Sequence, residues 1–110
     1  TVRFRCTPRV YRFLREGLQR YPPNQMRIAK PLPADTWRQP HAAQVILEPL
    51  ADSSHPYPVE IDLPPWTVTR DVDFRRWLFG YGADVLIEGP ELLRAEHHDR
   101  SMAVAALYEP

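Results

Sequence analysis

The chain lacks the features that mark several common protein classes. Its single cysteine, Cys6, can form neither an internal disulfide nor a cysteine-based zinc site, which suits a reducing cytoplasm. No stretch approaches the roughly 18 uncharged apolar residues that a membrane-spanning helix needs. None of the four glycines belongs to a phosphate-binding loop. The 14 basic and 14 acidic side chains cancel, so no overall field marks a nucleic-acid or membrane-surface protein.

Proline and arginine, by contrast, are abundant. The 13 prolines are roughly twice the usual share, and they cluster at 22–23, 31–33, 56–58 and 64–65. Because proline lacks a backbone donor and stops helices, each cluster predicts a loop.

The charge is unevenly distributed along the 110 residues. Residues 1–30 carry a net charge of +7 and residues 31–110 a net charge of −7. Arg3 and Arg5 fall on the polar face of an expected strand, and Arg27 falls on a neighbouring one. Arginine binds phosphate and carboxylate groups bidentately, so these three residues form a candidate phosphate or nucleic-acid patch. The other interpretation is that the acidic remainder neutralises them, inside the molecule or in a dimer.

The first elements follow from hydrophobic periodicity. Val2, Phe4 and Cys6 alternate with polar residues, which predicts a half-buried strand over residues 1–7. Thr7-Pro8 suits the start of a helix that Pro22-Pro23 ends. Its apolar stripe consists of Val10, Phe13, Leu14, Leu18 and Tyr21.

Further strands are predicted over residues 25–30, 44–48, 58–63 and 83–88. The second helix is expected to begin near Asp71 or Thr69, either of which can cap it, and to end at Gly80 or Gly82, one of them left-handed. Residues 91–108 predict a third helix. Residues 31–42, which include Trp37 and His41, are expected to be irregular.

This order of elements predicts one α+β domain over residues 1–110. Two strand–helix–strand units favour a ferredoxin-like split βαβ sandwich (βαββαβ) with an additional C-terminal helix. That helix must pack on a sheet edge, on the open sheet face or on another copy of the chain.

The chemical side chains give no catalytic or metal pattern. In His97-His98-Asp99, adjacent helical residues point about 100° apart and cannot converge on one ion, so a solvated face is expected. The neighbouring residues 52–55 contain Asp, Ser and His but cannot adopt the geometry of a triad. His41 and His55 are expected at the surface. Cys6 falls on an apolar strand face and is expected to be inert. We therefore expect no enzyme activity, no metal and no cofactor.

Several large apolar residues do not fall on the inward stripes of their elements: Trp37, Trp66, Phe79 and Leu86. Exposed aromatic and apolar residues mark interfaces. Trp66 and Leu86 are therefore our candidate interface residues.

The stretch from Asp71 to Arg94 contains a recognisable succession of motifs. A helix with the pair Trp77-Leu78 ends at Gly82, and a strand then leads to Pro90-Glu-Leu-Leu-Arg94 and a final helix. This succession resembles the C-terminal extension (WCX) domain that follows the WYL domain in bacterial transcription regulators. Residues 2–18 fit the opening of that domain, whereas residues 31–56 look like an insertion or a divergent hairpin. The linker Leu63-Pro-Pro-Trp-Thr is also similar to a CRISPR-associated subset known from cyanobacteria.

The resemblance implies a non-catalytic regulatory and dimerisation domain with a ferredoxin-like fold. In the family, the extension helps to form a homodimer and modulates the sensing of a nucleic-acid or nucleotide ligand by contacting the WYL domain of the same chain. Neither a WYL motif nor a helix-turn-helix occurs in the 110 residues. The start, Thr1-Val2-Arg3, is neither a signal peptide nor a natural initiator, so we expect a piece of a longer protein.

Two alternatives come from other functional classes. The first is a free-standing ferredoxin-like module that binds single-stranded nucleic acid through Arg3, Arg5 and Arg27, with an affinity that falls steeply with salt. The second is a small enzyme, which needs convergent histidine and carboxylate groups.

Overall fold

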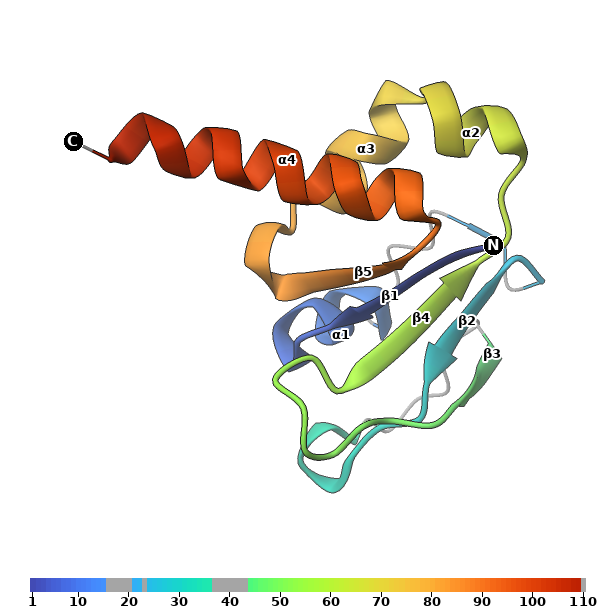
Figure 1. Ribbon diagram of the computed structural model, residues 1–110. Coiled ribbons are helices and arrows are strands. Elements are labelled where there is room, and N and C mark those ends of the chain that lie inside the picture. The colour runs from blue at the N-terminus through green and yellow to red at the C-terminus, as the bar shows by residue number, and fades with distance from the viewer. Residues whose placement is uncertain (16–20, 23, 37–43, 110) are drawn as a thin grey trace.

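A five-stranded sheet forms the centre of the computed structural model, which describes residues 1–15, 21–22, 24–36 and 44–109 (Figure 1). The strands within these residues are β1 (Val2–Cys6), β2 (Met26–Ala29), β3 (Gln44–Leu47), β4 (Tyr57–Ile61) and β5 (Val85–Gly89). The α-helices described are α1 (Pro8–Arg15), α2 (Pro65–Arg70), α3 (Val72–Phe79) and α4 (Glu91–Tyr108), with short 3-10 turns η1 (Pro33–Asp35) and η2 (Gly82–Asp84). The expected α+β class is confirmed.

The sheet is mixed, with the strand order β3-β2-β4-β1-β5. β1 lies antiparallel to both β4 and β5, and β2 lies antiparallel to β4. Among the strands described, only the edge strand β3 runs parallel to its neighbour, β2. Residues 31–56 therefore do more than connect two strands, because part of this segment extends the sheet by one strand.

The core lies on one face of the sheet. Val2, Phe4 and Cys6 are fully buried on β1, as their alternation predicts. The ring of Tyr11 on α1 stacks on Tyr57 of β4 at 3.8 Å between centroids. On α3, buried Phe74 and Leu78 join the same cluster. Helices α1 and α3 thus cover the same face of the sheet and leave the other face open.

The region after β4 differs from the expectation. The proline-rich segment predicted as a linker starts helix α2 at Pro65, because proline suits the first position of a helix. Asp71 caps α3, as predicted, by accepting hydrogen bonds from the backbone nitrogens of Asp73 (2.9 Å) and Phe74 (3.2 Å). Thr69 does not cap this helix; its hydroxyl donates to the carbonyl of Pro65.

Gly82 is the left-handed glycine of the turn after α3, with φ at 58°, whereas Gly80 keeps a right-handed helical conformation. Several expectations lie outside the described residues: the continuation of the first helix through Leu18, the stop at Pro23, and the placement of Trp37 and His41.

Helix α4 has the predicted bounds, and it packs against β5 through its first half. Leu93 is its fully buried residue. Its second half extends past the sheet (Figure 1). None of the helices in the described ranges is long and apolar enough to cross a membrane.

Candidate functional site

The three candidate arginines lie on one face of the sheet. Core residues alternate with Arg3 and Arg5 along β1, and with Arg27 on β2. These side chains therefore point to the face opposite α1 and α3. The structure brings the predicted patch together.

Each of these arginines has an acidic partner on a neighbouring strand. Arg27 donates to Glu60 at 2.8 Å and to Asp62 at 2.9 Å, and the guanidinium holds the pKa of Asp62 well below its usual range. The Nε atom of Arg3 lies 3.6 Å from Glu60. These pairs join β1 and β2 to β4 and the residue that follows it.

Arg5 lies on the same face, and its acidic partner is on β5, the strand that neighbours β1 on the side away from β4. Its Nε atom lies 3.5 Å from a carboxylate oxygen of Glu88 on β5, and its Nη1 atom donates to the hydroxyl of Ser53 at 3.3 Å. The three arginines thus share the face with three carboxylates, those of Glu60, Asp62 and Glu88. A phosphate group that approached this face would meet nearly balanced charge.

The candidate interface residues Trp66 and Leu86 are both exposed and lie on different elements. Trp66 belongs to α2. Leu86 belongs to β5, where it pairs in register with Arg5 on the arginine-bearing face.

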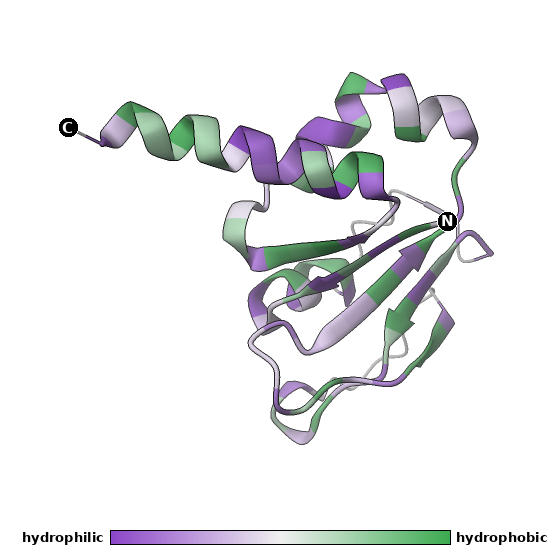
Figure 2. Cartoon of the chain, viewed as in Figure 1, coloured by the Kyte–Doolittle hydropathy of each residue, from purple (hydrophilic) through white to green (hydrophobic). Residues whose placement is uncertain are grey.

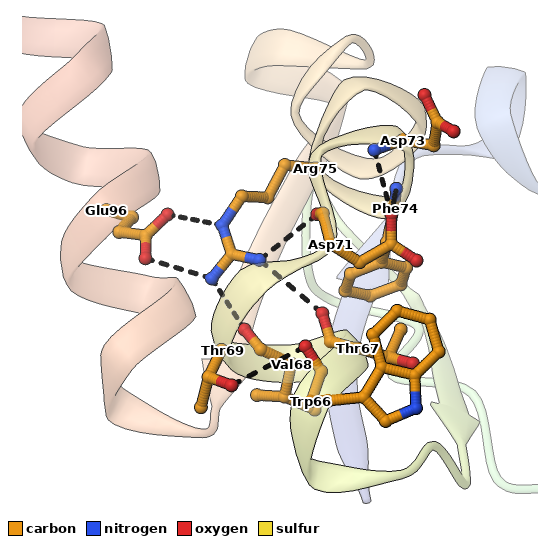
Figure 3. A network of polar contacts seen from close by, with 9 residues as sticks. All are labelled: Trp66, Thr67, Val68, Thr69, Asp71, Asp73, Phe74, Arg75 and Glu96. Atoms are coloured by element: carbon orange, nitrogen blue, oxygen red, sulfur yellow. Dashed lines mark hydrogen bonds and ion pairs between the residues drawn. The ribbon is translucent and has the colours of Figure 1, made fainter.

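A buried arginine holds α4 to the rest of the molecule (Figure 3). The Arg75 side chain on α3 is only 6% exposed, and it forms a two-point ion pair with Glu96 of α4, at 2.7 and 3.0 Å. Its remaining donors bind the backbone carbonyls of Thr67, Val68 and Asp71. One side chain therefore joins α2, α3 and α4. The ion pair lowers the pKa of Glu96 below its ordinary value.

A second contact between α3 and α4 is aromatic. The ring of His97 stacks on Phe79 at 5.2 Å between centroids, and the Arg100 guanidinium lies 5.1 Å from the same ring. Burial lowers the pKa of His97. The expected solvated face therefore holds for His98 and Asp99, which are exposed, and is wrong for His97.

A groove of about 450 Å³ opens beside this contact, between α4, the end of α3 and the turn that precedes β5. Its walls are mostly small or apolar, and among the described residues that line it the permanently charged group is the guanidinium of Arg100. The lining residues are Phe79, Gly82, Ala83, Val85, His97, Arg100, Ser101, Val104 and Ala105.

The end of α4 projects from the molecule as an apolar helix. Residues 102–108 carry no charge, and the hydrophobic colouring of this end is visible in Figure 2. Met102, Val104, Leu107 and Tyr108 are 61%, 55%, 78% and 84% exposed. A helix that is apolar on all sides is normally buried against a partner. This end of α4, together with the groove at its base, is our candidate functional site.

The remaining chemical groups are engaged within the fold. Burial raises the pKa of the Cys6 thiol to about 12, so the expected inert core role fits its surroundings. His55 is partly buried rather than simply at the surface, and its ring nitrogens contact Ser54 (2.9 Å) and the carbonyl of Ala83 (2.7 Å). In the part of the chain that the structure describes, no group of three or more His, Cys, Asp or Glu side chains could hold a metal ion.

Sequence reasoning missed two of the most informative features. In the sequence, Arg75 looks like a surface residue. None of the residues next to it in the sequence indicates that Glu96, 21 residues further on, lies against it. The apolar end of α4 did carry a signal: residues 102–108 contain no charged side chain on any side of the helix.

Comparison of the chain with protein-family models, with curated proteins and with solved structures finds no match.

Proposed function

We propose that this chain is a non-catalytic regulatory and dimerisation domain, of the kind that the WCX resemblance implies for WYL-type transcription regulators. The observation that carries the proposal is the projecting end of α4, whose apolar side chains are exposed on every side. Burying such a surface in a second copy of the chain removes apolar area from water, which is the main driving force of association.

The strand order supports the ferredoxin-like part of the proposal. Without the edge strand β3, the order is β2-β4-β1-β5 with every neighbouring pair antiparallel. This is the order that two interlocked strand–helix–strand units produce, with β1, α1 and β2 as one unit and β4, α3 and β5 as the other. We accordingly treat β3 and α4 as additions to a βαββαβ frame.

The charge arrangement favours assembly over direct binding of nucleic acid. Arg3, Arg5 and Arg27 lie against Glu60, Asp62 and Glu88, so carboxylates inside the molecule neutralise these three arginines. Affinity for nucleic acid depends on unneutralised cations that release counterions. In the proposed regulator, the WYL domain of the same chain senses the ligand. Contact between that domain and this one transmits the effect of ligand binding.

Native mass spectrometry of the purified chain, at several protein and salt concentrations, tests the proposal. We expect a concentration-dependent dimer near twice the 12.8 kDa monomer mass, without additional bound mass. A monomer that carries nucleotide-sized extra mass, which salt removes, would contradict the proposal and favour the arginine face as a nucleic-acid site.

A further inference from the structure

The projecting end of α4 and the groove at its base lie next to each other on the same molecule. The groove is lined on one side by His97, Ser101 and Val104 of α4 itself. Tyr108 follows at the next position of the same spacing, so these residues recur at intervals of four, three and four. This is the spacing of the contact stripe of a two-stranded helical pair.

We propose that two copies of the chain associate through this surface, with their α4 helices antiparallel and crossing near Ser101 and Val104. Each projecting end then lies along the groove of the other copy. Because the dimer has two-fold symmetry, it buries both grooves and both ends. In this register Ser101 of one copy faces Val104 of the other, and Tyr108 approaches His97. The inference rests on the proposed dimerisation function and names the surface that performs it.

Charge complementarity favours a second copy as the occupant. The permanently charged group in the groove is Arg100, beside His97, with no carboxylate among the lining residues. The charged side chain at the tip of the helix, within the described residues, is Glu109. The carbonyl end of a helix also carries partial negative charge, so the tip as a whole suits a cationic groove.

The available area is enough for a weak but specific dimer. The nine residues from Arg100 to Tyr108 form a rod roughly 13 Å long and about 10 Å wide. Enclosing two such ends in two grooves buries on the order of 1,000 Å² in total, near the lower limit for a specific interface. We therefore expect a dimer that dissociates on dilution through the micromolar range.

Two exposed aliphatic residues on α4, Val104 and Leu92, provide a matched test. Val104→Asp places a charge in the proposed interface, and Leu92→Asp places the same charge on the half of α4 that packs on β5. Val104 and Leu92 are 55% and 46% exposed, so both variants are expected to fold, and circular dichroism checks this. In sedimentation velocity we expect the wild-type chain and Leu92→Asp to dimerise, and Val104→Asp to remain monomeric.

The possible outcomes distinguish an error in the proposed surface from an error in the proposed dimerisation function. If Val104→Asp still dimerises as the wild type does, the α4 surface is wrong while the dimerisation function stands. If the wild-type chain remains monomeric up to the highest concentration tested, both are wrong. A loss of dimer in Leu92→Asp but not in Val104→Asp would also overturn the proposed surface.

Disulfide formation tests the register directly. We expect a mixture of Ser101→Cys and Val104→Cys chains to form a mixed disulfide rapidly at low micromolar concentration. Met102→Cys is the control, because Met102 is exposed on the same turn but points to another side of the helix. The native Cys6 is buried and does not compete. Equal rates for the control and the mixture would overturn the antiparallel register.

Discussion

At the scale of single residues, Arg75 joins α4 to α2 and α3. Its guanidinium is buried between three helices, and all of its N–H groups donate hydrogen bonds to Glu96 or to backbone carbonyls. Removal of such a side chain leaves a carboxylate and several carbonyls without their partners. The effect is therefore larger than that of a surface ion pair.

We predict that Arg75→Ala lowers the free energy of unfolding by about 3 kcal/mol, because it breaks a buried ion pair by removing one partner. Urea unfolding followed by circular dichroism measures this loss. The control is Arg76→Ala, at the exposed neighbouring position, for which we expect a change below about 0.5 kcal/mol. Similar losses in the two variants would contradict a special role for Arg75.

The His97 ring gives a second prediction, on pH. Burial lowers the pKa of this ring in the folded chain below its ordinary value of 6.5, so the unfolded chain takes up the proton first as the pH falls. Stability is therefore expected to be complete above about pH 6.5 and to decrease as the pH falls from there toward the folded pKa.

The variant His97→Phe keeps an aromatic ring against Phe79 and removes the titration. Thermal unfolding between pH 7 and pH 5 compares it with the wild type. This range stays above the ordinary Glu pKa of 4.5, so Glu96 does not contribute to the difference. We expect a smaller pH dependence in the variant, and the same pH dependence in both chains would show that His97 is not responsible.

At the scale of secondary-structure elements, α3 begins where a side chain satisfies its first backbone donors. Asp71 accepts from two of them. We predict that Asp71→Ala lowers the free energy of unfolding by about 1 kcal/mol, the usual cost of losing such a cap. Asp73→Ala, which leaves the cap intact, is the control, and the comparison is made by urea unfolding. An equal loss in the control would indicate a general charge effect instead.

The strands and α4 could be predicted from the sequence because each carries a clear local pattern. The alternation of Val2, Phe4 and Cys6 gives β1, and the run from Glu91 to Tyr108 lacks any helix breaker. The pair Pro64-Pro65 predicts a loop, whereas in the structure Pro65 occupies the first position of helix α2. Local patterns also could not place Arg75, since its partner Glu96 lies 21 residues away in the chain.

The candidate functional residues and the groove were predictable only in part. The positions of Arg3, Arg5 and Arg27 on one sheet face followed from strand periodicity, but their acidic partners depend on the register of β4 and β5. Trp66 and Leu86 are exposed, in agreement with their places off the inward stripes, and their interface role stays a prediction. The groove beside Phe79 brings together three segments, and no periodicity within one element predicts such a site.

At the scale of the whole molecule, basic and acidic side chains from neighbouring strands form ion pairs on the open face of the sheet. The three acids Glu60, Asp62 and Glu88 neutralise the three arginines of the open face. We predict that the wild-type chain does not bind single-stranded DNA measurably at physiological salt. The triple variant Glu60→Gln, Asp62→Asn, Glu88→Gln is expected to bind it, with an affinity that falls as salt rises.

Fluorescence anisotropy with a labelled oligonucleotide measures both chains. Because all three substitutions replace acids with amides of nearly the same shape, the side-chain volumes of the open face are preserved. Binding by the wild type as tight as that of the triple variant would show that these ion pairs do not neutralise the face, and it would favour the direct nucleic-acid function.

The central claim is that the exposed end of α4 becomes buried when two copies of the chain associate. Hydrogen exchange measured at increasing protein concentration tests it most directly, because exchange reports both whether a segment is protected and where that segment lies. We predict that amides of residues 101–109 exchange quickly in dilute protein and become protected as concentration rises through the micromolar range, while those of β1 stay protected throughout. Exchange of residues 101–109 that does not depend on concentration, in a sample shown to dimerise, would contradict the claim.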